Sequence, residues 1–354
     1  MGKKKSLSVL MGLALFVTGC SYPVPSDSMP EENTVTEQIT VTESEKTTVT
    51  ETSKESEPLT FNPHVYCGLL SSICTEDHWN SLYNLCDAIR AGEDTFECAG
   101  EDVYKWCTDD TVIGSFLPVS CTLVKPDGYE DGIGRIKYMM DKDEFLAREQ
   151  AFEDEVCRIL NEAVRSDYSD FEKCMGLYDY MTENFQYDYS DIDGQGVDDF
   201  STYACLMSKK GICCEMAGAY SYLLLQCGVE AMVYGGDGSA GYHDWVYVIL
   251  DGKGYHVDPT WALYGGDEYG VLSLTYFMET DEERISDGFD REAFEADWIW
   301  YWNTGYDRSM FPAVDGRFSV LHDWATFRSM DTERNVITCI SSDGDEFEFS
   351  YGDL

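Results

Sequence analysis

HDWVYVILDGKGYHVDPTW, residues 243–261, is the stretch of the sequence that most directly indicates a fold. It contains two runs rich in aromatic and β-branched residues, 243–250 and 254–258, and each run is typical of a β-strand. Asp251-Gly252 between them is a strong signal for a tight hairpin turn. The stretch therefore predicts an antiparallel pair of strands joined by a short loop.

The register of this hairpin decides which side chains can meet. A two-residue loop pairs Leu250 with Lys253, whereas a four-residue loop pairs Tyr247 with Asp258. Either loop places His243 and Asp258 on the same face of the sheet, because side chains alternate along a strand. With the two-residue loop they form a diagonal pair about 7–8 Å apart between backbones, which an imidazole and a carboxylate can bridge.

A pair of adjacent cysteines lies on a predicted helix upstream of the hairpin. GICCEMAGAYSYLL, residues 211–224, has apolar residues at helical spacing, and Gly228 stands where a glycine C-cap is expected. Cys213 falls in the first turn, where unpaired backbone N–H groups and the helix dipole lower the pKa of a thiol. Cys214, about 100° further round, points off this stripe and is interpreted as a packed neighbour. A strained disulfide between the two cysteines is the alternative.

Further helices and a strand are predicted around this helix. Apolar residues between Phe152 and Ala163 recur at helical spacing, and Ser169 followed by Glu172 is typical of a capping box. After the cysteine helix, VEAMVY at 229–234 is expected to form a third strand. The amphipathic helices need a core to pack on.

The thiol, the imidazole and the carboxylate together meet the requirements of thiol acyl-transfer chemistry. A histidine can take the thiol proton, a carboxylate can orient the imidazole, and backbone N–H groups near the thiol can stabilise an oxyanion. His256 shares a face with Asp258 and is a rival base, for which a structural role is preferred. Trp245 and Trp261 are interpreted as core residues or cleft walls.

Three segments carry a resemblance to a known family. GIC at 211–213 followed by Ala217, HDW at 243–245, and YHVDPTW at 255–261 resemble the core of the transglutaminase-like superfamily. The resemblance spans roughly residues 170–261. Its most specific part is YHVDPTW, placed after the HxW motif.

This resemblance implies a fold and a set of roles. The implied fold is α+β with a papain-like core, in which the cysteine helix packs on an antiparallel sheet. Cys213 is implied as the nucleophile, His243 as the base and Asp258 as the orienting carboxylate. STYACL at 201–206 resembles the family's lead-in to the nucleophile, so Tyr203 is implied as support for the oxyanion.

Some residues depart from the family pattern. Glu215 and Met216 stand where the family often has glycine and an aromatic residue. A carboxylate two residues from the thiol opposes thiolate formation unless it caps the N-terminus of the helix. Asp244 beside His243 is also less usual, and its side chain is expected to point to the opposite face.

The N-terminal segment has the features of an exported protein. Residues 1–20 begin with a lysine-rich stretch, followed by an apolar run too short to span a bilayer, which is typical of a secretory signal. The closing VTGC resembles a bacterial lipobox, which implies lipidation of Cys20; cleavage without lipidation is the alternative. Residues 21–60 repeat Val-Thr-Glu and contain no aromatic residue after Tyr22, so no core can form and a disordered stalk is predicted.

Charge and cysteine content limit the partners. The chain has 24 basic and 67 acidic residues and a net charge of −43 at pH 7, which disfavours nucleic acid as a partner. Of fourteen cysteines, setting aside Cys20 and Cys213 leaves twelve, which could form up to six disulfides or stay as buried thiols. No close CxxC pair occurs, so a structural zinc site is not expected, and the implied chemistry needs no metal or organic cofactor.

The chain is expected to have five parts: a lipoprotein signal peptide (1–20), a disordered stalk (21–60), a cysteine-containing accessory region (61–145), a transglutaminase-like catalytic domain (146–285) and a C-terminal extension that packs on the core (286–354). LTYFMETDEERI, at the end of the fourth part, resembles the tail that follows the core in relatives. WIWYWNTGYD at 298–307 is interpreted as core rather than as a substrate-contacting surface.

The function implied by these features is that of a surface-anchored, extracytoplasmic enzyme. It would act on amide bonds of peptide, protein or cell-wall peptide substrates through a thioester at Cys213, and hydrolysis is expected before transfer. The alternatives are a protein cross-linking transglutaminase and a catalytically inactive binding module, which the charge of Glu215 favours. The expected membrane contact is the lipid on Cys20.

Overall fold

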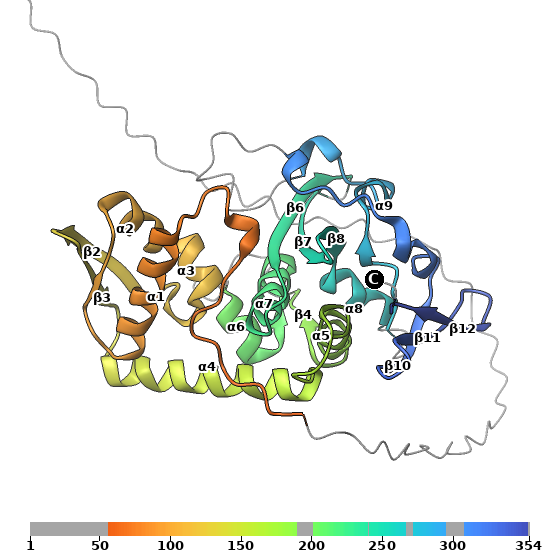
Figure 1. Cartoon of the computed structure of the whole chain (residues 1–354), viewed down its shortest axis with the longest axis horizontal. Helices are drawn as coiled ribbons and strands as arrows, with labels where there is room; N and C mark the ends of the chain where they lie inside the picture. The colour runs from red at the N-terminus through yellow and green to blue at the C-terminus, as the bar shows by residue number, and fades with distance from the viewer. Residues whose placement is uncertain (1–55, 190–200, 240, 267–271, 295–307, 353–354) are drawn as a thin grey trace, which may run out of the picture.

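The computed structural model describes residues 56–189, 201–239, 241–266, 272–294 and 308–352 (Figure 1). The predicted signal peptide with Cys20, nearly all of the predicted stalk, and the aromatic segment at 298–307 lie outside the described residues. Among the helices that the structure describes, none has both the length and the apolar character needed to cross a membrane.

The accessory region folds into short helices and a small sheet, on the left in Figure 1. Its three strands are antiparallel in the order β1-β3-β2. The elements in chain order are η1 (Gly68–Leu70), α1 (Glu76–Arg90), β1 (Thr95–Glu97), α2 (Glu101–Cys107), α3 (Asp110–Phe116), η2 (Pro118–Ser120), β2 (Val124–Glu130) and β3 (Ile133–Tyr138).

A long helix, α4 (Lys142–Ala163), links this region to the rest of the molecule and runs along the base of both in Figure 1. It begins earlier than the apolar periodicity indicated, because the Asp141 side chain caps it by accepting hydrogen bonds from the N–H groups of Asp143 and Glu144 at 3.0 and 3.3 Å. The expected boundary at 145/146 therefore lies within one continuous helix.

The next part contains helices packed on a four-stranded antiparallel sheet in the order β6-β7-β8-β9. Helix α7, which carries the adjacent cysteines, packs on β6 and β7, so the predicted α+β architecture is confirmed. The elements are α5 (Asp170–Asn184), β4 (Gln186–Tyr187), α6 (Thr202–Ser208), β5 (Lys210–Gly211), α7 (Cys213–Gln226), β6 (Ala231–Gly238), β7 (Gly241–Leu250), β8 (Lys253–Val257), α8 (Pro259–Gly266) and β9 (Phe277–Glu279).

Local predictions in this part are confirmed. Ser169 and Glu172 form the capping box at the start of α5, and Leu250 pairs with Lys253 across the two-residue hairpin loop. The third strand differs from the expected 229–234. It starts two residues later, because the N–H of Val229 still bonds to the last turn of α7, and it continues to Gly238 in register with β7.

The C-terminal segment returns to the helical side of the core. Tyr351 stacks on Phe171 of α5 with ring centroids 4.4 Å apart, and its hydroxyl donates a hydrogen bond to Glu172 at 2.7 Å. The elements are α9 (Asp281–Ser286), η4 (Arg291–Ala293), η5 (Arg308–Met310), η6 (Gly316–Leu321), β10 (Thr326–Asp331), β11 (Val336–Ile340) and β12 (Glu346–Ser350), the last three forming a separate antiparallel sheet.

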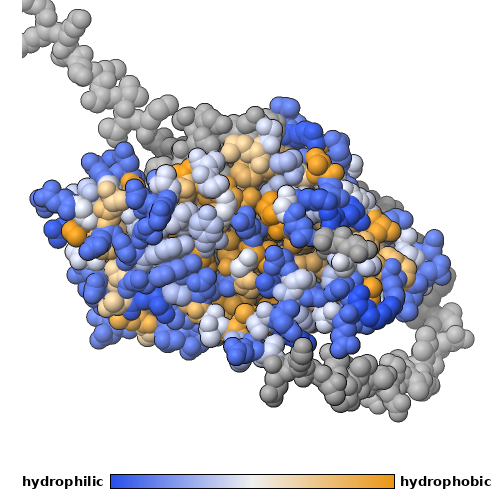
Figure 2. Space-filling model, viewed as in Figure 1, coloured by the Kyte–Doolittle hydropathy of each residue, from blue (hydrophilic) through white to orange (hydrophobic). Residues whose placement is uncertain are grey.

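The polar residues and the cysteines lie in different parts of the molecule. Hydrophilic residues cover most of the face in Figure 2, with an apolar area near its centre. The thirteen cysteines among the described residues are all free thiols, and most of them are buried. Of the two alternatives for these cysteines, the structure shows free thiols that fill the core.

Candidate active site

Cys213 is the first residue of α7, as predicted, and its side chain is buried with 4 % of its surface exposed. The helix start is fixed by Glu215, whose carboxylate accepts hydrogen bonds from the N–H of Ile212 at 2.9 Å and of Ser201 at 3.0 Å. Glu215 therefore caps the helix, and its contacts with these backbone N–H groups offset part of the effect of its charge on a neighbouring thiolate.

Cys214 faces a different side of α7. It lines a cavity of about 190 Å³ between this helix and the accessory region, together with Gly218 and Tyr222 of α7 and with Phe116 and Cys121 of the accessory region. The predicted separation of the two adjacent thiols is confirmed, and Cys213 is not among the residues that line this cavity.

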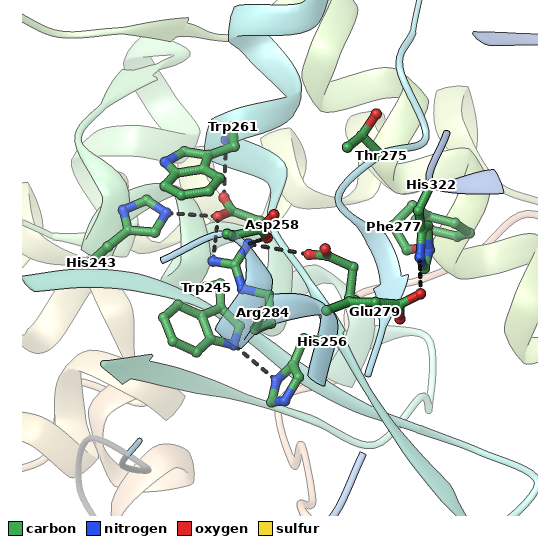
Figure 3. A network of polar contacts seen from close by, with 12 residues as sticks. His243, Trp245, His256, Asp258, Trp261, Thr275, Phe277, Glu279, Arg284 and His322 are labelled. Carbon is green, nitrogen blue, oxygen red and sulfur yellow. Dashed lines mark hydrogen bonds and ion pairs between the residues drawn. The ribbon is translucent and has the colours of Figure 1, made fainter. Parts of the chain in front are cut away.

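His243 and Asp258 meet in the buried part of the sheet (Figure 3). His243 lies on β7 and Asp258 directly follows β8, and the distance from His243 Nε2 to Asp258 Oδ2 is 2.7 Å. The two residues are 3 % and 0 % exposed. Their predicted position on one face of the sheet is confirmed. Within the described part of the chain, the other ring nitrogen, His243 Nδ1, is buried and makes no hydrogen bond.

Aromatic rings fix the orientation of the His243 imidazole. Trp261 stacks on it with centroids 5.1 Å apart and an interplanar angle of 22°, and Phe289 does so at 5.9 Å and 22°. Trp261 is therefore a wall of this site, whereas Trp245 is fully buried beneath it. A ring held in this way presents its two nitrogens in fixed directions.

The Asp258 carboxylate has a partner for each oxygen. Oδ1 accepts hydrogen bonds from the N–H groups of Thr260 and Trp261, both at 3.0 Å, and so caps the first turn of α8. Oδ2 is shared by His243 and by Arg284, whose guanidinium lies 3.0 Å away. Burial acts to raise the pKa of Asp258, but the interaction with His243, the positive charge of Arg284 and these hydrogen bonds outweigh it, so the pKa is lowered.

Arg284 on α9 was not identified as a site residue from the sequence. It is fully buried and forms ion pairs with Asp258 at 3.0 Å and with Glu279 and Asp287, both at 3.2 Å (Figure 3). The centre of its guanidinium lies 4.4 Å from the centroid of Trp245 and 4.9 Å from that of Trp261. The only sequence signal is a single arginine in the acidic segment 281–287.

The three carboxyl groups around Arg284 are not equivalent. Burial raises the pKa of Glu279 well above its usual value, and burial also raises the pKa of Asp287. Only Asp258 has a lowered pKa. The positive charge of Arg284 is therefore most consistently balanced by an ionised Asp258, the form that can orient an imidazole.

His256, the rival base, is engaged elsewhere. Its Nδ1 accepts a hydrogen bond from the indole N–H of Trp245 at 2.9 Å, and its Nε2 lies 2.9 Å from Oδ1 of Asp281. Burial lowers the pKa of His256 despite the neighbouring Asp281. Because the indole can only donate, Nε2 carries the proton, and both nitrogens serve the packing of the sheet.

Tyr203 and Asp244 complete the residues singled out from the sequence. Tyr203 on α6 is half-buried and packs against Phe152 of α4 with centroids 5.7 Å apart, so its support of an oxyanion stays a prediction. Asp244 is buried and pairs with Gly235 of β6 on the face of β7 opposite to His243. No group of His, Cys, Asp and Glu within the described ranges is placed to hold a metal ion.

Residues 158–259 match the family model of the transglutaminase-like superfamily core. The chain contains a transglutaminase-like superfamily domain. The matched range includes Cys213, His243 and Asp258 and ends before Arg284. Members of this superfamily are typically cysteine enzymes.

Solved structures that resemble the chain include three at low sequence identity. A TGase is 15 % identical over 40 % of this chain and 46 % of its own, with a TM-score of 0.27. A protein from Cytophaga hutchinsonii described as a candidate cysteine protease is 11 % identical over 49 % of this chain and 66 % of its own, with a TM-score of 0.28. The arylamine N-acetyltransferase NAT3 of Bacillus cereus is 12 % identical over 56 % of this chain and 93 % of its own, with a TM-score of 0.29. The chain thus spans less than half the length of the TGase. No curated protein gives a significant match.

Proposed function

We propose that this chain is a thiol enzyme in which Cys213 attacks an amide carbonyl, His243 transfers the proton and Asp258 orients the imidazole. The observation that supports this most is the buried 2.7 Å contact between His243 and Asp258, inside a domain of a family of cysteine enzymes. It leaves His243 Nδ1 as the nitrogen that is available to a thiol or a leaving group.

The reaction follows from these roles. His243 Nδ1 takes the proton of the Cys213 thiol, and the thiolate adds to the amide carbon. Backbone N–H groups at the start of α7 stabilise the oxyanion, with Tyr203 as a further candidate. The leaving amine then takes the proton from His243, and a thioester remains on Cys213. Water resolves the thioester with the same histidine as base, so the net reaction is hydrolysis.

The substrate and the setting belong to the proposal. The substrates would be peptides, proteins or cell-wall peptides, and the enzyme would be held at the outer face of the membrane by a lipid on Cys20. An amine in place of water would make the product a new amide, which is the transglutaminase alternative. The yields of free acid and of new amide from a peptide substrate, measured with and without an added primary amine, separate hydrolysis from transfer.

Alkylation of each cysteine by iodoacetamide between pH 4 and 9, read by mass spectrometry, tests the site without a known substrate. We expect Cys213 to react fastest at acidic pH, and we expect His243→Ala to move that reactivity to alkaline pH. Cys214→Ala is the matched control and leaves the profile of Cys213 unchanged. An ordinary thiol profile for Cys213 that is the same with and without His243 would contradict the proposed function.

A further inference from the structure

The cavity beside Cys214 is formed jointly by the helix of the proposed nucleophile and by the accessory region. Its volume is about 190 Å³. One side is α7, together with the start of α6 and with β6, and the other side is α3 of the accessory region, which contacts α7. The space therefore exists only where the two parts of the molecule meet.

Small residues on two helices leave this space open. Cys214, Gly218 and Ser221 are spaced four and three residues apart, so they lie on one face of α7. Gly114 lines the cavity from α3. Outside its own helix, the nearest atom to a Cβ placed on Gly114 is Sγ of Cys121, at 3.3 Å. A larger side chain at position 114 would therefore occupy the cavity itself.

The wall of the cavity is more apolar than polar. Phe116 and Leu225 are buried residues that line it. Among the described residues, the charged side chains in the wall are both carboxylates: Asp110 pairs with Lys125 at 2.9 Å, and Glu215 caps α7. An anionic group is therefore disfavoured, and a neutral apolar group is favoured. A dry cavity of about 150 Å³ is large enough to hold benzene, so this space can take a side chain the size of leucine or phenylalanine.

The cavity begins next to the proposed nucleophile. Glu215 belongs to its wall and also accepts the N–H groups of Ile212 and Ser201 at the start of α7. Cys213 does not line the cavity, but Cys214 does, and the Cα atoms of consecutive residues are about 3.8 Å apart. An extended substrate residue spans a similar length, about 3.3–3.6 Å. A side chain next to an amide held at Cys213 is therefore within reach of the cavity.

We propose that this cavity is a specificity pocket, which takes the apolar side chain of the residue next to the amide that Cys213 attacks. The inference rests on the proposed function and adds the substrate class: peptides with a residue the size of leucine or phenylalanine beside the reacting amide. It also gives the accessory region a role, because α3 supplies one wall of the pocket. The accessory region selects the substrate and takes no part in the chemistry.

The test uses the full chain and three alkylating reagents that carry the same chloroacetyl group on glycinamide, on leucinamide or on the α-amide of glutamate. The rate at which each reagent labels Cys213 is read by mass spectrometry. We expect the leucine reagent to label Cys213 at least about tenfold faster than the glycine reagent, because only its side chain fills the pocket. The glutamate reagent should be no faster than the glycine reagent.

Two variants fill the cavity from the accessory region and leave α7 unchanged. Gly114→Leu should remove the advantage of the leucine reagent and keep the rates with the glycine reagent and with iodoacetamide. Cys121→Leu, on the same wall, serves the same purpose if Gly114→Leu does not fold. Gly100→Leu is the matched control: a Cβ there meets no atom within 4 Å, and Gly100 is not among the lining residues, so the advantage should remain.

The outcomes separate this inference from the proposed function. If Cys213 reacts fast with iodoacetamide at acidic pH but equally fast with the leucine and glycine reagents, the proposed function stands and the pocket is refuted. An advantage that persists in Gly114→Leu and Cys121→Leu also overturns the inference, because the apolar side chain then binds elsewhere. If Cys213 reacts with iodoacetamide like an ordinary thiol, the proposed function is contradicted, and this inference fails with it.

Discussion

Asp258 is the residue on which both the structure and the proposed chemistry of the site depend. One oxygen caps α8 through two backbone N–H groups, and the other is shared by His243 and Arg284. A single substitution can separate these two roles, because an amide keeps an acceptor oxygen but not the charge.

The Asp258→Asn variant should retain the cap of α8 and lose the charge that orients the imidazole. We expect the alkylation rate of Cys213 at pH 6 to fall at least about tenfold, since a neutral amide no longer holds the imidazolium. Asp258→Ala also removes the cap and should unfold more easily, by about 1 kcal/mol or more relative to Asn. The measurements are alkylation kinetics and urea unfolding. An unchanged alkylation rate in Asp258→Asn would separate this residue from the reactivity of the thiol.

Arg284 should act on the reaction through Asp258, as a positioning residue. Its charge lowers the pKa of Asp258, so removal of the charge raises that pKa. We expect Arg284→Met to move the acid limb of the Cys213 alkylation profile to higher pH, and to cost about 3–5 kcal/mol of stability by leaving buried carboxyl groups unpaired. Arg284→Lys keeps the charge and should restore most of the profile.

The matched control for Arg284 is an arginine in an exposed ion pair. Arg334→Met removes the pair with Glu348 at the surface and should leave both the stability and the profile nearly unchanged. If Arg284→Met loses stability but keeps the alkylation profile of the unaltered protein, Arg284 has a structural role only.

At the scale of elements, the N-terminus of α7 combines a cap with a charge close to a thiol. Glu215 accepts two backbone hydrogen bonds, and its side chain is almost fully buried, with 4 % exposed. The negative charge of Glu215 stabilises the N-terminus of the helix, but it opposes the ionisation of a neighbouring thiol. Two substitutions at this position separate the effects.

We expect Glu215→Ala to destabilise the protein by about 1–3 kcal/mol, because two backbone donors lose their acceptor. Glu215→Gln keeps one acceptor oxygen and should lose less. In the Gln variant the alkylation profile of Cys213 should move to lower pH, since a like charge near the thiolate is gone. Glu76→Gln changes a carboxylate in the first turn of α1 and serves as the control. A shift of the profile to higher pH in Glu215→Gln would show that the cap matters more to the thiol than the charge.

How far the sequence predicts each element depends on the distance between the residues that define it. The hairpin and the start of α7 are local: Asp251-Gly252 fixes the turn, and alternation then places His243 and Asp258 on one face. Arg284 lies 26 residues after Asp258 in the sequence and on a different element, helix α9. The spacing of apolar residues within either element therefore does not predict their contact. The exact start of α4 was missed because its cap, Asp141, precedes the apolar pattern.

For the whole molecule, acidity is the dominant property, and its effect on stability depends on where the carboxyl groups lie. The net charge is −43 at pH 7, yet exposed carboxylates stay ionised until the pH approaches 5, so this charge changes little between pH 8 and 5.5. Among the carboxyl groups, those that titrate in that range are the few with raised pKa values. Removal from water raises the pKa of Glu149 to about 7 and, together with Glu183, that of Asp179 to about 6.

The contribution of these two carboxyl groups to the stability of the protein should therefore rise as the pH falls from 8 to about 5. It acts against an opposing contribution from His78 and His256, whose pKa values are lowered by burial. Glu149 and Asp179 bind protons more tightly in the folded state, so each destabilises the fold above its folded pKa, and this penalty is gone below the unfolded value. We expect a gain on the order of 1–3 kcal/mol in urea unfolding, and little dependence on salt because local desolvation is its main cause.

Below about pH 4.5 the sign reverses. Ion pairs and hydrogen bonds lower the pKa of Glu155 and of Glu283 to about 2, so the stability they contribute is lost as the pH falls from the unfolded value towards 2. Glu149→Gln mimics the protonated form and should be more stable than the unaltered protein at pH 8 and equally stable at pH 5. Glu346→Gln, at an exposed position on β12, is the control and should keep the full rise. At 0.5 M salt the Debye length is about 4 Å, so repulsion between surface charges is largely screened. If the rise in stability persists in Glu149→Gln but disappears at this salt concentration, repulsion between the many negative charges is its cause.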